Sequence, residues 1–163
     1  MSYFPDLSDY TYSHVRASDT KNVGWLDSQY EFAKGSVSDA VKETLWRFCT
    51  VSVEQTRGIH PCSLCADVEL ARYPVADRNG ERLLLGSAEI RVFGADTLVY
   101  AAPTLIYHYV VEHSYLPPVP FIEALQAGPA PPSAEYFDRL SRVGLEWRPT
   151  LKPSPVRRRW PPP

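Results

Sequence analysis

The chain has 163 residues, of which 44% are hydrophobic and 12% aromatic, and its formal net charge is −2. This length and composition are typical of one globular domain with a sizeable core. No run of 18 apolar residues occurs, so the sequence predicts no membrane-spanning helix, and the charge gives no indication of nucleic-acid binding. Because the N-terminus has no basic segment followed by an apolar one, we expect no secretory signal and a cytoplasmic protein with reduced thiols.

Helix and strand signals alternate along the chain. Ser36–Asp39 offers N-capping groups before an apolar stripe of helical period, and Asn79-Gly80 is typical of a tight hairpin turn. The expected elements are a helix over 37–49, strands over 51–55, near 68–75 and from Arg82, a hairpin of 88–93 and 97–101, and helices over 104–115, 120–127 and 134–143. They predict an α+β fold with a small antiparallel sheet and three or four helices.

Proline and basic residues concentrate at the C-terminus. Twelve of the 16 prolines fall at or after Pro117, and residues 152–163 carry four basic side chains and no acidic one. Such a segment cannot bury enough apolar surface to order itself, and it favours extended conformations. We therefore predict one domain over 1–148 and a flexible Pro/Arg-rich tail over 149–163. The tail is either a solubilising end or a contact for an acidic protein partner, and the sequence does not indicate an oligomeric state.

Four potential metal ligands form the clearest chemical signal. Cys62 and Cys65 make a CxxC turn, and His108 and His113 follow on a later helix. Both thiolates of such a turn can reach one ion, and Zn²⁺ prefers four nitrogen or sulfur ligands in a tetrahedron. A CxxC knuckle followed by a hairpin and a ligand-bearing helix is the treble-clef arrangement of zinc sites. The sequence therefore predicts a treble-clef-like core in which these four side chains bind Zn²⁺.

The spacing of the two histidines raises a geometric problem. His108 and His113 are five residues apart, so on a regular helix their side chains would point about 140° from each other. Pro117 and Pro118 indicate that the helix ends near His113, which would free its direction. If the helix does not distort there, His60 is the alternative ligand. An alternative is that no metal binds, in which case the histidines are ordinary helix residues and the cysteines are a buried reduced pair.

Other uses of the CxxC fit less well. A redox site of the thioredoxin type requires a CxxC that opens a helix after a strand, whereas the residues after Cys65 are predicted to form a strand. Nucleoside deaminases combine PCxxC with an upstream HxE, but here His14-Val15-Arg16 has an arginine in place of the acid. Neither reading is favoured.

A catalytic zinc remains the alternative function. The string from His108 to His113 is one residue longer than the HxxEH of inverted zinc peptidases. A site with Cys62, Cys65 and His108 as ligands, an open fourth position and Glu112 as general base would define a zinc-dependent hydrolase or lyase. If the site is not catalytic, Glu112 is interpreted as a residue on the solvent-exposed side of a helix.

Several further residues have structural interpretations. Glu89 alternates with apolar neighbours and is predicted to make a cross-strand ion pair. Cys49 ends an apolar helical stripe and is predicted to be a small buried side chain. The tyrosines near the histidines are expected in the core rather than in a pocket; they are Tyr107, Tyr109 and Tyr115.

Several strings together resemble a family of small uncharacterised bacterial proteins. They are Gly24–Leu26, Thr56–Cys65, Glu89–Val92, Val99–Pro103, His108–Val110 and His113–Pro118. The resemblance covers about residues 20–125. It implies a bacterial source, and it implies no activity, substrate or ligand set.

The sequence therefore predicts a small protein organised by a structural zinc. Because all four ligands come from the chain, the ion would stabilise the fold rather than catalyse a reaction. We expect a binding, interaction or regulatory module with a protein partner, and no catalytic residue.

Overall fold

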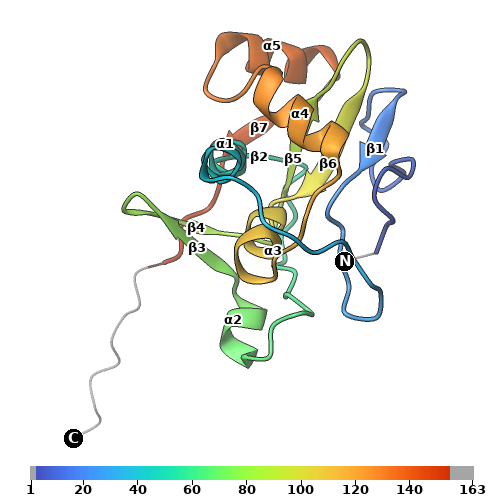
Figure 1. The fold of residues 1–163 in the computed structure, drawn as a ribbon. Helices are drawn as coiled ribbons and strands as arrows, with labels where there is room; N and C mark the ends of the chain where they lie inside the picture. Colours follow the sequence, from blue (N-terminus) through green and yellow to red (C-terminus); the bar gives the residue numbers. More distant parts are fainter. Residues whose placement is uncertain (1–2, 155–163) are drawn as a thin grey trace, which may run out of the picture.

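The computed structural model describes residues 3–154 and confirms the α+β class (Figure 1). Five helices and seven strands occur in these residues, whereas the sequence predicts three or four helices. The helices are α1 (Asp39–Cys49), α2 (Val68–Arg72), α3 (Ile106–Glu112), α4 (Val119–Ala127) and α5 (Ala134–Arg142). The strands are β1 (Thr20–Asn22), β2 (Val51–Val53), β3 (Val75–Arg78), β4 (Glu81–Leu84), β5 (Glu89–Phe93), β6 (Val99–Pro103) and β7 (Trp147–Pro149).

The main sheet has five strands in the order β1-β6-β5-β2-β7. The β5–β6 hairpin at its centre is antiparallel, as predicted, with Glu89 opposite Pro103 and Phe93 opposite Val99. β1 runs parallel to β6, so the sheet is mixed rather than wholly antiparallel. The sequence does not predict β1 or β7, because each has only three residues and forms by pairing with a strand distant in the chain.

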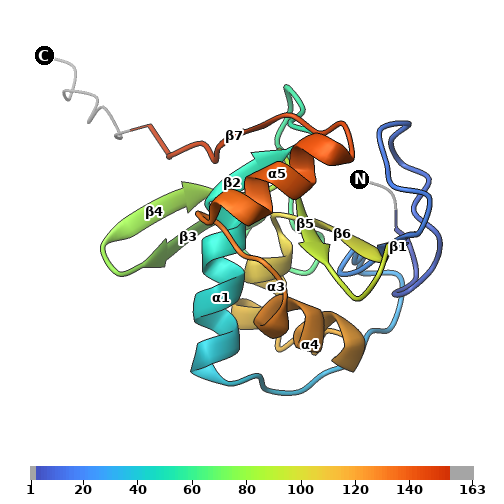
Figure 2. The same ribbon diagram turned by 90° about the horizontal axis from the view of Figure 1, so that it is seen from above.

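Both faces of the central strands are covered. Figures 1 and 2 show α1, α3 and α4 gathered on one side of the sheet, where Ile90 and Val92 belong to the main core. On the other side the N-terminal segment supplies Tyr10 and Trp25, which pack with Ala101 in a second, smaller cluster. Every residue of β5 and β6 is therefore buried.

The β3–β4 hairpin forms a separate sheet that projects from the main one (Figure 1). Its turn is the predicted Asn79-Gly80 pair, and both residues have the positive φ that tight hairpin turns require. Arg78 anchors the hairpin to α1 through Glu43, with Nε 2.6 Å from Oε2, and through Asp39. The hairpin thus lies against α1 and beside α3, the helix that carries His108 and ends at His113.

Two predicted elements differ from the structure. Residues 68–72 form helix α2 instead of the start of a strand, because the Asp67 side chain accepts hydrogen bonds from the N–H groups of Glu69 and Leu70 and caps a helical turn. Since β3 pairs only with β4 in antiparallel register, this helix still lacks the βαβ unit of a thioredoxin-type site. The helix predicted over 104–115 is shorter, because Pro103 ends β6 and the helical bonds stop at Glu112.

The chain returns to the main sheet after α5. β7 pairs with β2, and Thr150 is buried with its N–H 2.9 Å from the carbonyl of Thr50. The N–H of Leu84 also donates to the carbonyl of Leu151. The arginine-rich part of the predicted tail, residues 155–163, lies outside the described residues. The division at 148/149 stays a prediction.

Candidate metal centre

The CxxC turn lies between a loop that leaves β2 and the short helix α2. Three hydrogen bonds from backbone N–H groups position it. The N–H of His60 donates to the carbonyl of Gly86 at 2.7 Å, that of Cys62 to the carbonyl of Ala71 at 2.7 Å, and that of Ser28 to the Ser63 hydroxyl at 3.0 Å. The turn is thereby tied to the start of β5, to α2 and to the N-terminal region. Its position is set by contacts distant in sequence.

The first of these contacts depends on Gly86. This residue has a φ of +90°, and a Cβ there would lie 2.5 Å from the carbonyl oxygen of His60. Only glycine combines that conformation with so close a backbone approach. Gly86 therefore allows the loop before Cys62 to lie against the sheet.

The two histidines come from the end of α3. His108 lies inside the helix and is 5% exposed, whereas His113 is the C-cap, with a φ of −116° and a ψ of 8°. Ser114 follows in the left-handed region with a φ of +54°, and the N–H of Tyr115 donates back to Tyr109 at 3.0 Å. The helix thus ends where the prolines predict, and His113 is freed from the direction that a regular helix would impose.

The four side chains converge on one point. The Nε2 atoms of His108 and His113 are 3.2 Å apart, and Cys65 Sγ lies 3.2 Å from the first and 3.4 Å from the second. Cys62 Sγ lies 3.3 Å from His113 Nε2, and all four atoms are within 4.8 Å of one another. A tetrahedral zinc would separate two nitrogens by about 3.3 Å and a nitrogen from a sulfur by about 3.6 Å. The four observed separations lie within about 0.4 Å of the tetrahedral values, and the whole group is close enough to bind a metal.

Without an ion, the local electrostatics favour the neutral forms of Cys65, His108 and His113. Burial, together with the adjacent Cys62 thiol, raises the pKa of Cys65 to about 11. Burial and the neighbouring His113 lower the pKa of His108 to about 4, and burial also lowers the pKa of His113. Neutral imidazole is the form that binds a metal. The Cys65 thiol, by contrast, needs a cation beside it to ionise, which a divalent metal supplies.

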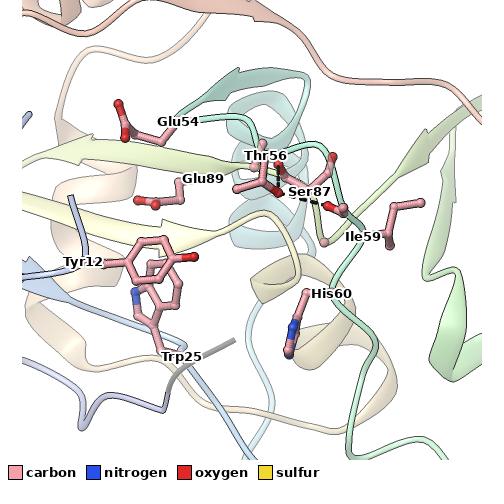
Figure 3. Close-up of a pocket in the computed structure, with 11 residues that line it drawn as sticks. Tyr12, Trp25, Glu54, Thr56, Ile59, His60, Ser87 and Glu89 are labelled. Carbon is pink, nitrogen blue, oxygen red and sulfur yellow. Dashed lines mark hydrogen bonds between the residues drawn. The ribbon is translucent and has the colours of Figure 1, made fainter.

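The remaining sequence candidates lie elsewhere. His60 is not part of the four-residue group and instead lines a pocket with Tyr12 and Trp25 (Figure 3). Glu112 is exposed on α3. The three tyrosines near the histidines and Cys49 are buried in the core, as predicted.

Glu89 makes an ion pair, but its partner is not across the sheet. Arg91, two residues along β5, donates from Nη1 to Glu89 Oε2 at 2.6 Å, and the side chains are 1% and 4% exposed. Tyr10 donates its hydroxyl to the same carboxylate and accepts from Arg91 Nη2. The sequence shows the i, i+2 spacing of the two charges, but not the aromatic segment that covers them. The cross-strand part of the prediction is therefore wrong.

The fold and the cluster together define a class: an α+β protein with a Cys₂His₂ group able to hold a metal ion. The model of a family described as a domain of unknown function (DUF7919) matches residues 2–126, and the chain belongs to this family. The match includes all four cluster residues, whereas α5 and β7 lie beyond it. No curated protein and no solved structure matches the chain.

Family membership agrees with the resemblance to an uncharacterised family. The particular string of motifs and the bacterial source stay predictions. Within residues 3–154, no helix has the length and apolar character needed to cross a bilayer.

Proposed function

We propose that this protein is a zinc-binding interaction module in which Cys62, Cys65, His108 and His113 hold one structural Zn²⁺. The observation that carries the proposal is the convergence of two Sγ and two Nε2 atoms within 4.8 Å of one another. Two thiolates and two imidazoles are a ligand set that favours zinc over the oxygen-seeking cations.

A structural role is favoured over a catalytic one. The zinc enzyme considered from the sequence needs a coordination position open to water, and Nε2 of His113 takes that position. A tetrahedron completed by four protein ligands is typical of structural zinc. Cys62 and His108 are also buried, with 1% and 5% of their surface exposed.

Helix α2 is the element that a zinc ion would stabilise most directly. It has five residues and buries none of them, and so short a helix is unstable without tertiary support. Its hydrogen bond from Cys62 to Ala71 and its Asp67 cap hold it beside the CxxC turn. A zinc ion anchoring the turn would therefore hold α2 in place, with its exposed Val68 and Leu70 available to a protein partner.

Metal analysis of three matched cysteine variants tests the proposal. Purified protein is expected to contain about one zinc per chain, and Cys62→Ser and Cys65→Ser are expected to lose it. Cys49→Ser is the control, because Cys49 is a buried cysteine outside the cluster and its loss should leave the zinc content unchanged. Wild-type protein without zinc that also fails to take up added zinc would contradict the proposal, as would equal zinc binding by Cys65→Ser.

A further inference from the structure

A second candidate site is lined in part by the loop that precedes the CxxC turn. A cavity of about 300 Å³ opens between the N-terminal segment, the loop after β2 and the start of β5 (Figure 3). This volume is at the lower end of the range for small-molecule pockets. The residues that line the cavity include Tyr12, Trp25, Glu54, His60, Ser87 and Glu89.

An aromatic pair forms one wall. The ring of Tyr12 lies 5.3 Å from that of Trp25 at an interplanar angle of 45°. Trp25 is 1% exposed and its indole N–H donates to the carbonyl of Ala101 at 3.0 Å, whereas Tyr12 is 46% exposed. The fixed Trp25 thus backs an accessible tyrosine ring whose face can receive a ligand.

A buried carboxylate also lines the cavity. Glu89 is 3% exposed and receives hydrogen bonds from two groups, Arg91 and the hydroxyl of Tyr10. A carboxylate offers about four lone-pair sites, so Glu89 can accept a hydrogen bond beyond those from Arg91 and Tyr10. Arg91 compensates the charge of Glu89 from within the fold and is not among the lining residues.

A second carboxylate gives the cavity its excess negative charge. Glu54 lines it at the end of β2. Burial raises the pKa of Glu89, and the negative charge of Glu54 acts in the same direction as a smaller cause. Among the described residues that line the cavity, none is a lysine or an arginine. An anionic ligand would therefore meet repulsion, and a cation would meet two carboxylates and an aromatic face.

We propose that this pocket binds an organic cation, a guanidinium or alkylammonium group, between the ring of Tyr12 and the carboxylates of Glu54 and Glu89. The ring face attracts the cation through its quadrupole, and partial desolvation in the cavity strengthens that attraction. Glu54 supplies the ion pair and Glu89 a charge-assisted hydrogen bond. The group belongs either to a free small molecule or to an arginine or lysine side chain of a partner protein. The proposal does not depend on the bound metal.

The test is a nuclear magnetic resonance titration of the full-length, isotope-labelled protein. The probe is butylguanidinium, and its matched neutral control is butylurea, which has similar shape and no charge. The expected result is saturable shift changes at the amides of His60 and Ser87 with butylguanidinium alone. Equal binding of butylurea, or no saturable change at these amides, would overturn the proposal.

Two variants sharpen the test without removing Glu89, whose loss would leave Arg91 unpaired. Glu54→Gln is expected to weaken binding about tenfold, whereas Glu69→Gln, the same change on α2 outside the cavity, is expected to have no effect. Tyr12→Leu is expected to weaken binding about threefold and Tyr12→Phe to preserve it. Unchanged affinity in both Glu54→Gln and Tyr12→Leu would refute the assigned site.

A final arm identifies the source of the cation. The same titration is run with an N-acetylated, C-amidated Gly-Arg-Gly peptide. Binding at least as tight as that of butylguanidinium indicates a side chain of a protein partner, and much weaker binding indicates a free small molecule. Either outcome supports a cation site, because the guanidinium group is common to both probes.

Discussion

At the scale of single residues, Gly86 decides how closely the CxxC turn approaches the sheet. Its positive φ and its contact with the His60 carbonyl leave no room for a side chain. Gly58, in the same loop, has no neighbouring atom within 4 Å of where its Cβ would be. Substitutions at Gly86 and at Gly58 can therefore be compared. The comparison distinguishes a packing requirement at Gly86 from the general effect of replacing a glycine in this loop.

We expect Gly86→Ala to lower the free energy of unfolding by about 2–3 kcal/mol, because alanine is strained at this φ and collides with backbone. It should also weaken zinc binding by displacing the loop before Cys62. Gly58→Ala is expected to be close to neutral. Urea unfolding and zinc competition titrations measure both effects. Equal stability of the two variants would contradict this explanation of Gly86.

The buried pair of Glu89 and Arg91 gives a second prediction at this scale. Glu89→Gln leaves the Arg91 charge buried without its counter-ion, so it should cost about 3–5 kcal/mol of stability. The control is Glu135→Gln, which breaks an exposed pair with Arg139 on α5 and should cost less than about 0.5 kcal/mol. Thermal or urea unfolding of both variants measures the difference. Similar costs would mean that the pair does not stabilise the sheet in this way.

At the scale of elements, the end of α3 determines whether two histidines five residues apart can meet. His108 is placed by the helix and His113 by the residue that terminates it, with Ser114 in the left-handed region. The hydrogen bond from Tyr115 to Tyr109 then holds the reversed chain against the helix. In a regular helix, an i, i+4 spacing places two side chains on the same face. Here the helix terminus brings His108 and His113 together instead.

Ser114→Val is therefore expected to weaken zinc binding about tenfold or more, although Ser114 is not a ligand. A β-branched residue disfavours the left-handed conformation, so the terminus would rearrange and move the His113 ring. Ser114→Gly keeps this conformation accessible and is expected to retain wild-type affinity. Competition titration against a chromophoric zinc chelator measures both variants. Full affinity in Ser114→Val would show that His113 does not need this turn.

At the scale of the whole molecule, the Cys₂His₂ group brings together the CxxC turn and α3. Both also belong to the main hydrophobic core, which includes Cys62 and Tyr109. Helix α2, which lies between them in the chain, has no buried residue. Loss of metal should therefore affect α2 and the CxxC turn first and the sheet less.

Removal of zinc by a chelator is expected to lower the melting temperature by roughly 10 °C, since a ligand at about a thousand times its Kd contributes about 4 kcal/mol. In hydrogen exchange, the amides of α2 should lose protection while those of β5 and β6 keep theirs. The Cys62→Ser/Cys65→Ser double variant should not respond to the chelator. A uniform loss of protection over the whole chain would instead mean that zinc supports the entire fold.

The sequence by itself determined the features that depend on neighbouring residues. The Ser38 cap of α1, the Asn79-Gly80 turn and the Ser133 cap of α5 are all present, because capping and turn formation need only a few consecutive side chains. The α+β class and the grouping of Cys62, Cys65, His108 and His113 also follow from pattern and chemistry; that they bind a metal stays a prediction.

Only the tertiary structure decided the features that depend on distant contacts. β1 and β7 exist through pairing with β6 and β2, α2 through its cap and its bond to the CxxC turn, and the meeting of His108 with His113 through the way α3 ends. The pairing of Glu89 with Arg91 required the N-terminal segment to bury them on one face of β5. The strand pairings and the burial of Glu89 with Arg91 depend on residues tens of positions away, which local sequence signals do not encode. The Asp67 cap and the turn at Ser114 involve only nearby residues, but neither of them is predicted from the sequence.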